Sequence, residues 1–214
     1  MNIGVVLAQI DLGSIALPEF QRGYVWNREQ VRGLMGSLYR RHPVGGLLVW
    51  VTKTEGANPR GEGPVSPGFV KLLLDGQQRI TSLYGIIKGH APAFFDGNAQ
   101  SFTGLYFNME TEAFEFYAPI RMQNDPLWIN VTDLMQKGPG SYMAKIFQTP
   151  EWENKRELYS QRINAISLIK DIDLHVEEVT GDDKDVDTVV EIFNKVNSGG
   201  TKLSKGDLAL AKVC

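Results

Sequence analysis

A short apolar run passes directly into a polar turn in the sequence Val70-Lys71-Leu72-Leu73-Leu74-Asp75-Gly76-Gln77-Gln78-Arg79. The apolar run is typical of a buried strand, and apolar residues recur at helical spacing from Ile80 to Ile87. We therefore predict a strand, a turn with one glycine, and a helix that fades at Gly89. The backbone N–H groups at the start of such a helix are unpaired and the helix dipole is positive there, so this junction suits an anion.

The polar residues of this turn allow two interpretations. In the first, Arg79 is a bidentate donor suited to phosphate, and Asp75 holds Mg²⁺ or orients a water molecule. In the second, Asp75 only caps the helix, while Gln77, Gln78 and Arg79 are ordinary exposed polar residues. Five short polar residues are a weak signal, and both interpretations stay open at this point.

A second informative stretch mixes aromatic, polar and cationic residues without clear periodicity: Leu17-Pro18-Glu19-Phe20-Gln21-Arg22-Gly23-Tyr24-Val25-Trp26. A loop of this composition can offer stacking faces and hydrogen-bond donors together, which suits a base or a nucleotide. Alternatively it is a hydrophobic plug, in which Phe20, Tyr24 and Trp26 pack on the core while Gln21 and Arg22 tie the loop down. The sequence alone does not decide between these two interpretations.

A third stretch ends a predicted helix. That helix starts near Asp185 and is expected to end in Asn197-Ser198-Gly199-Gly200, where glycine permits a left-handed cap. Such a turn leaves backbone N–H groups free and can form an anion-binding nest, with Thr201 and Lys202 at hand. The alternative is a capped corner between two helices. No Walker A loop occurs anywhere in the sequence.

Composition places the chain among ordinary globular proteins. Its 214 residues are 43% hydrophobic and 22% charged, enough for one sizeable core or a core with a smaller lobe. The net charge of −3 argues against a non-specific nucleic-acid binder. Residues 1–60 nevertheless hold seven basic and four acidic groups, a net +3, which leaves −6 for the remainder. A polyanion is therefore expected to meet the N-terminal third first.

Several classes of site and location are excluded or disfavoured. The single cysteine, Cys214, rules out a disulfide framework and a thiolate zinc cluster, and three scattered histidines match no metal spacing. We see no signal peptide and no membrane-length apolar run, so we expect no membrane association and a cytoplasmic location. Residues 204–214 read as a helix without a stop signal, so we expect the N-terminal part of a longer protein.

The remaining elements are predicted from periodicity and capping residues. We leave residues 3–10 undecided between helix and strand. Strands are expected at 14–17, 46–52, 105–109, 113–117 and 171–180, and an extended segment at 128–135 whose Asp133 starts a short helix. Helices are expected at 27–41, capped by Asn27, and at 141–147 and 151–170, with a Gly- and Pro-rich loop at 54–68. Such a mixture indicates an α+β fold.

Taken together, the three stretches resemble the N-terminal domain of GmrSD-type restriction endonucleases. The resemblance rests on residues 17–26, on Asp75-Gly76-Gln77-Gln78-Arg79 and on Phe193-Asn194-Lys195-Val196-Asn197-Ser198-Gly199-Gly200-Thr201. It implies an α+β fold of the ParB/sulfiredoxin-like kind, a mixed small sheet with flanking helices. It also implies one domain over residues 1–214, with a core of 14–90 and 171–214 and a helical and hairpin insertion at about 91–170.

The resemblance further implies a role in prokaryotic defence. In the family this domain is associated with binding and hydrolysis of a nucleoside triphosphate (NTP) with Mg²⁺ and with sensing modified DNA, while an HNH-type nuclease domain does the cutting. The matching positions imply the following sites: hydrolysis at Asp75, Gln77, Gln78 and Arg79; Mg²⁺ at Asp75; nucleotide or DNA binding at Gln21, Arg22, Tyr24, Trp26, Gly76, Asn197, Gly199, Gly200 and Thr201. The chain carries no HNH constellation. Expected partners are modified DNA, nucleotide, the nuclease domain or subunit, and a second copy of the chain.

Two other functions stay open. The chain could be a non-catalytic module that binds DNA or a partner subunit and uses nucleotide only as a ligand. It could also be a ParB-like nuclease acting by itself, although that needs a metal-bound acidic cluster near Asp75, and the sequence places no second acid convincingly beside it.

Overall fold

The computed structural model describes residues 1–57, 59–61, 63–181 and 186–196. Within them, strands form a four-stranded sheet of order β1-β3-β2-β7 and a three-stranded sheet of order β5-β4-β6. The strands span Ile15–Ala16 (β1), Leu47–Lys53 (β2), Phe69–Asp75 (β3), Leu105–Asn108 (β4), Phe114–Phe116 (β5), Trp128–Asn130 (β6) and Val176–Val179 (β7). The larger sheet is mixed, because β2 and β3 are antiparallel whereas β1 runs parallel to β3 and β7 parallel to β2. The predicted α+β class, small sheets flanked by helices, is confirmed.

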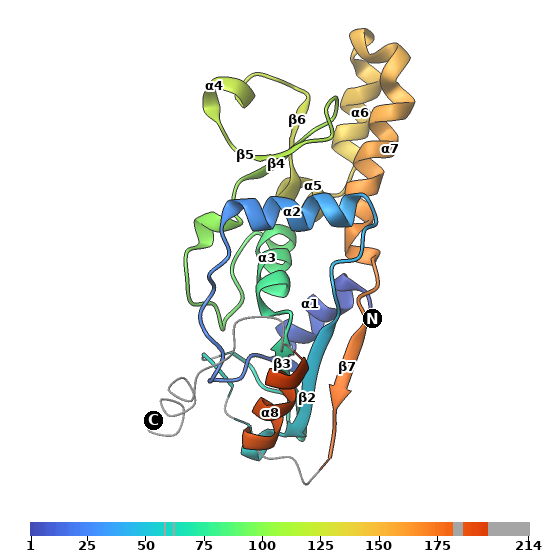
Figure 1. The fold of residues 1–214 in the computed structure, drawn as a ribbon. Coiled ribbons are helices and arrows are strands. Elements are labelled where there is room, and N and C mark those ends of the chain that lie inside the picture. The colour runs from blue at the N-terminus through green and yellow to red at the C-terminus, as the bar shows by residue number, and fades with distance from the viewer. Residues whose placement is uncertain (58, 62, 182–185, 197–214) are drawn as a thin grey trace.

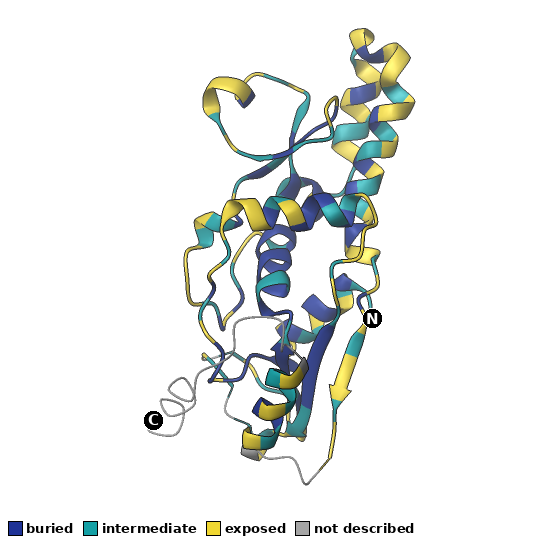
Figure 2. Cartoon of the chain, viewed as in Figure 1, coloured by how far each residue is buried: buried dark blue, intermediate teal, exposed yellow. Residues whose placement is uncertain are grey.

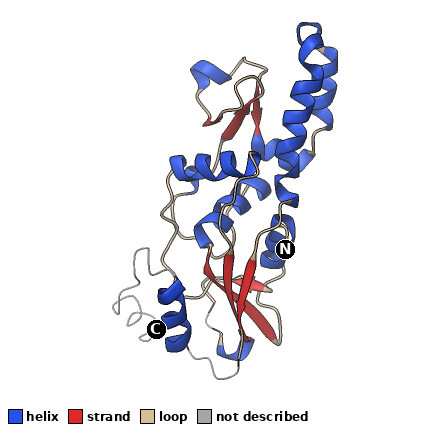
Figure 3. Cartoon of the chain, turned by 45° about the vertical axis from the view of Figure 1, so that its right-hand side comes forward, coloured by secondary structure: helices blue, strands red, loops and turns tan. Residues whose placement is uncertain are grey.

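Helices lie beside both sheets (Figure 1). The α-helices span Ile3–Asp11 (α1), Arg28–Tyr39 (α2), Gln77–Lys88 (α3), Pro119–Met122 (α4), Val131–Lys137 (α5), Gly140–Gln148 (α6), Arg156–Ser167 (α7) and Val186–Val196 (α8). Short 3-10 segments cover Thr54–Gly56, Ala99–Ser101, Pro150–Lys155 and Leu168–Asp171. In Figure 3 the four-stranded sheet lies below α2, and the three-stranded sheet and the α6–α7 pair lie above it.

The alternation of side chains along β3 explains why the larger sheet is covered on both faces. Leu72 and Leu74 belong to a buried cluster that contains Val189 and Val190 of α8. Leu73, between them in sequence, belongs instead to the large cluster formed with α1, α2 and α3. Successive strand residues point to opposite faces, so an uninterrupted apolar run is what a strand buried on both sides requires.

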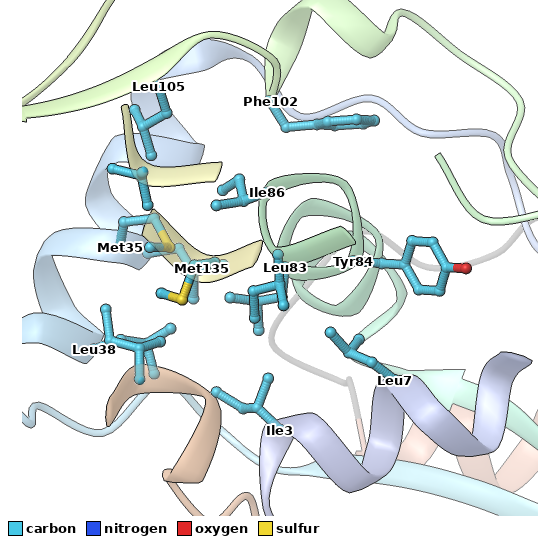
Figure 4. Packing of buried hydrophobic residues seen from close by; sticks show 14 of the residues in the cluster. Ile3, Leu7, Met35, Leu38, Leu83, Tyr84, Ile86, Phe102, Leu105 and Met135 are labelled. Carbon is cyan, nitrogen blue, oxygen red and sulfur yellow. The ribbon is translucent and has the colours of Figure 1, made fainter. Parts of the chain in front are cut away.

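Helix α3 is the central helix of the large cluster. All its residues from Ile80 to Ile87 are buried, and Figure 2 shows it as an almost continuous dark segment. Figure 4 shows Leu83 and Ile86 pointing toward residues of α2, α5 and β4, while Tyr84 projects on the side of α1. The buried residues of α3 include the polar Thr81 and Ser82 as well as the apolar ones, so these elements enclose the helix on nearly all sides.

The structure decides one prediction that the sequence leaves open and corrects three others. Residues 3–11 form a helix, whose first turn is capped by Asn2. The helix after β6 begins at Val131, because the Asn130 side chain accepts a hydrogen bond from the Asp133 N–H and so caps the helix earlier than predicted. The single helix predicted over 151–170 is divided into a 3-10 segment, α7 and a second 3-10 segment, with Lys155 leaving helical geometry at the first junction (φ −119°, ψ 2°). The strand predicted over 171–180 is limited to β7.

Candidate functional site at the start of helix α3

The turn between β3 and α3 is made by Gly76 in the left-handed conformation (φ 94°, ψ 2°). A Cβ atom built there would lie 2.4 Å from Leu47 Cδ2, so conformation and space both require glycine. Gly76 is the N-cap residue of α3, and no side chain caps the helix. The suggestion that Asp75 caps α3 is therefore wrong. Among the described residues, none accepts a hydrogen bond from the backbone N–H groups of residues 77–79.

Arg79 anchors the segment that follows α2. Its guanidinium donates to the carbonyls of Val44 (2.9 Å) and Gly46 (2.5 Å) and lies 3.2 Å from Asp75 Oδ2. The side chain is only 20% exposed. Arg79 is therefore not an ordinary surface residue. Its side chain is mostly buried, and its guanidinium joins the start of α3 to residues 44–46.

The two glutamines bind the loop that precedes α2. Gln77 is buried and donates from Nε2 to the carbonyl of Arg22 at 2.8 Å. Gln78 Oε1 accepts from the backbone N–H groups of Val25 (2.9 Å) and Trp26 (3.2 Å), and its Nε2 donates to the carbonyl of Gly23 (3.3 Å). The interpretation of these two side chains as ordinary exposed residues is also wrong. The segments before and after α2 are thus both hydrogen-bonded to the first turn of α3.

The loop itself is largely packed. Gln21 is buried and donates to the carbonyl of Leu74 at 2.7 Å. Tyr24 is buried, its hydroxyl lies 2.8 Å from the Ser82 hydroxyl, and burial raises the pKa of the Tyr24 phenol. Phe20 is buried and Trp26 partly buried.

These positions agree with the interpretation of the loop as a hydrophobic plug, except for the position of Arg22. The Arg22 side chain is exposed and has no hydrogen bond or ion pair with any described residue, while its carbonyl holds Gln77. Arg22 therefore does not tie the loop down through its guanidinium. That group is available to a ligand.

The polar groups left open at this turn are few. The Asp75 side chain is 43% exposed, and Arg79 is its ion-pair partner. Across the part of the chain that the structure describes, no group of three or more His, Cys, Asp or Glu side chains is placed to hold a metal. One half-exposed carboxylate does fit Mg²⁺ held mostly by water and phosphate oxygens, because that ion keeps several waters and takes few carboxylates. It does not fit a metal cage made only of protein ligands.

Residues 3–214 match the family described as "GmrSD restriction endonuclease, N-terminal domain". The chain belongs to this family. The GmrSD N-terminal domain described here is also 27% identical, over 232 aligned positions, to the uncharacterized protein MJ0686 of Methanocaldococcus jannaschii. That alignment covers 94% of this chain but only 39% of the relative, so the chain spans well under half the length of that protein. Restriction endonucleases act on DNA. None of the described helices has the length and apolar character that crossing a membrane requires.

The predicted site residues of the third motif in this GmrSD N-terminal domain lie outside the described residues: Asn197, Gly199, Gly200 and Thr201. Helix α8, which contains the first residues of this motif (193–196), is described and packs on the sheet. Val189 and Val190 share a buried cluster with Phe20 of the first motif. Asn194 Oδ1, near the end of α8, is buried and accepts no hydrogen bond from a described residue.

Sequence reasoning missed the segment that receives Arg79. Arg79 binds the backbone carbonyls of Val44 and Gly46, and a carbonyl group does not depend on the residue type. The Gly45-Gly46 pair is the one sequence feature that could have indicated this contact. Gly45 has φ +84°, and a Cβ there would lie 2.6 Å from Arg79 Nη1. The absence of side chains lets the backbone of this GmrSD N-terminal domain approach the guanidinium closely.

Proposed function

We propose that this domain binds a nucleoside triphosphate at the amino end of α3, hydrolyses it, and uses that cycle to report contact with modified DNA to a nuclease domain of the HNH type. The observation that carries the proposal is the construction of the first turn of α3. Its free backbone N–H groups lie beside the half-exposed carboxylate of Asp75, and the side chains of this turn hold two loops in fixed positions around it.

The described residues divide into binding and positioning groups. The backbone N–H groups of residues 77–79 and the positive end of the α3 dipole favour phosphate oxygens. Arg22 has an exposed guanidinium in the adjoining loop, suited to stabilising negative charge on the transferring phosphoryl group. Arg79 uses two of its N–H groups on carbonyls and so acts mainly by positioning.

The two amides differ in what they can do for a water molecule. Gln78 uses its oxygen on two N–H groups and its nitrogen on a carbonyl, so its amide is committed to the loop. Gln77 donates from its nitrogen, and its oxygen has no described partner. Of the two, Gln77 is better placed to orient an attacking water, with Asp75 as the neighbouring acceptor. Mg²⁺, when bound through Asp75 and phosphate oxygens, would supply charge neutralisation on the phosphates.

The test is phosphate release from ATP, GTP, CTP and UTP with Mg²⁺, for the parent domain and for Asp75→Ala and Arg22→Ala. Both substituted side chains are at least partly exposed, so we expect little loss of folding. The matched controls are Asp171→Ala and Arg121→Ala, at exposed positions outside the three motifs. Release that disappears in the Asp75 variant and persists in both controls would support the proposal. Unchanged release in Asp75→Ala, or no release by the folded parent domain with DNA present, would contradict it.

A second function has its own supporting observation. The side chains of Gln77, Gln78 and Arg79 all bind protein backbone, as residues of a rigid binding module would. In that case the domain binds DNA or a partner subunit without chemistry. DNA affinity that falls steeply with salt, together with absent phosphate release, would select this function.

A further inference from the structure

A second site lies on the side of α3 that faces α1. It is a partly open cavity of about 160 Å³. It is formed by the end of α1, strand β1, residues 59–60 and 63–65, the middle of α3 and the turn after α3. None of residues 75–79 lines it. The lining side chains are Ile10, Asp11, Ile15, Ala16, Pro59, Arg60, Gly63, Pro64, Val65, Tyr84, Ala93 and Phe94.

Nine of the twelve lining residues carry no polar side-chain group, although polar and apolar atoms contribute about equally to the exposed lining. Three side chains supply the polar side-chain groups. Asp11 Oδ1 accepts from the Tyr84 hydroxyl at 2.6 Å, and its Oδ2 accepts from Lys88 Nζ at 2.7 Å. Arg60 donates from Nη1 to the carbonyl of Gln21 at 2.5 Å and from Nη2 to Asp96 at 2.5 Å. Each charged group of the lining is therefore already neutralised by a partner.

Both Asp11 and Arg60 nevertheless keep unused hydrogen-bonding positions. An ionised carboxylate offers about four lone-pair positions and a guanidinium five N–H groups. Asp11 uses one position on each oxygen and Arg60 uses two N–H groups. The cavity thus presents an acceptor and a donor beside apolar side chains, without a net charge that would select an ion.

We propose that this cavity binds a neutral heteroaromatic ring of the size of a single nucleobase ring. The ring would donate an N–H to Asp11, accept a hydrogen bond from Arg60 and contact the apolar side chains of the lining, such as Ile10, Val65 and Phe94. The size supports this class, because an apolar cavity of roughly 150 Å³ holds benzene, whereas drug-sized ligands need about 300 Å³ or more. The charge balance disfavours phosphate and carboxylate ligands.

The cavity is connected to the first motif by direct bonds. Besides its bond to the Gln21 carbonyl, Arg60 donates its backbone N–H to the carbonyl of Leu17 at 2.7 Å. A ring that engages the Arg60 guanidinium therefore contacts the group that holds the 17–26 loop. This inference does not require hydrolysis at Asp75. The ring can come from a free nucleotide or from a base extruded from DNA.

The test is a titration of the isotope-labelled domain with cytosine, followed by the amide resonances of residues 11, 84 and 93. We expect saturable shifts with a dissociation constant of about 1 mM, typical of a ligand with few atoms. Ala93→Trp places a large ring at an exposed lining position, and we expect it to weaken binding about tenfold or more, which corresponds to about 1.4 kcal/mol. Ala8→Trp, on the exposed side of α1 and outside the lining, should leave binding unchanged.

Absence of saturable shifts in the parent domain, or equal binding by Ala93→Trp, would overturn the inference. Two further titrations of the same variant separate the sources of the ring. Weaker binding of cytidine triphosphate assigns the cavity to the base of a free nucleotide. Weaker binding of a DNA duplex that contains one unpaired cytosine assigns it to an extruded base. Phosphate release measured beside them reports on Asp75 separately, so failure of either proposal is recognisable.

Discussion

The side-chain amide of Gln21 donates a buried 2.7 Å hydrogen bond to the backbone carbonyl of Leu74, the residue before Asp75. This bond joins the first motif to the end of β3. We predict that Gln21→Ala lowers the free energy of unfolding by about 1–3 kcal/mol, because a buried carbonyl loses its donor. Urea unfolding measures this, with Gln123→Ala at an exposed position as the control. A change under 0.5 kcal/mol, typical of surface sites, would show that water replaces the amide.

Gln78 fixes the backbone of the 23–26 segment, and an isosteric change can test this. Gln78→Glu keeps an oxygen for the N–H groups of Val25 and Trp26 but turns the donor toward Gly23 into a second acceptor. An oxygen facing the Gly23 carbonyl is repulsive, so we expect faster amide hydrogen exchange at residues 23–26 and a small loss of global stability. Gln148→Glu, at an exposed position at the end of α6, is the matched control. Equal exchange in both variants would mean that the Gly23 contact contributes nothing.

Sequence reasoning succeeded for the elements whose signals lie within the element itself. The apolar run before Asp75 and the helical spacing after Arg79 fix β3 and α3, and Asn27 caps α2 with Gln30 in a capping box. These are local signals, because the residues that form each element are adjacent in sequence. The family resemblance, which rests on short motifs in a fixed order, was confirmed by the match over residues 3–214.

What the sequence could not predict is which groups the motif side chains bind. Arg79 reads as a phosphate donor from its position, yet its guanidinium binds carbonyls more than 30 residues earlier in the chain. Backbone carbonyls have no residue identity, so no spacing rule points to them. The functional roles of Asp75, Gln77 and Arg22 stay predictions until hydrolysis is measured.

Gly76 is predicted to be less replaceable than a glycine of similar conformation at the other end of the same helix. Gly76 and Gly89 have φ values of 94° and 80° and the same ψ of 2°. A Cβ at Gly76 meets Leu47 Cδ2 in the core at 2.4 Å, whereas a Cβ at Gly89 meets the end of the exposed Gln136 side chain at 2.5 Å, which can move. We expect Gly89→Ala to cost about 1–2 kcal/mol, from backbone strain, and Gly76→Ala about 1–3 kcal/mol more. Equal losses in urea unfolding would show that Leu47 repacks without cost.

Asp11 gives the fold a predictable response to acid. Burial acts to raise the pKa of its carboxyl, but the hydrogen bonds from Lys88 and Tyr84 outweigh burial, so the pKa lies below its ordinary value. Burial, and after it the same contact with Asp11, raise the pKa of the Tyr84 phenol. A carboxyl whose pKa is lower in the folded state stabilises the fold above its unfolded pKa of about 3.9, and this contribution is lost as pH falls through the folded value.

We therefore predict that Asp11→Asn destabilises the domain at pH 7 and that the difference from the parent domain shrinks as pH falls below about 4. The carboxylate is 37% exposed, so solvent screening keeps the effect modest. Thermal unfolding of both proteins from pH 7 down to the acid limit of the fold measures it, and Asp171→Asn, at an exposed aspartate, is the control. A difference that stays constant across this range would mean that the substitution acts through packing around Tyr84. A difference confined to neutral pH, and absent in the control, would assign it to the charged carboxylate.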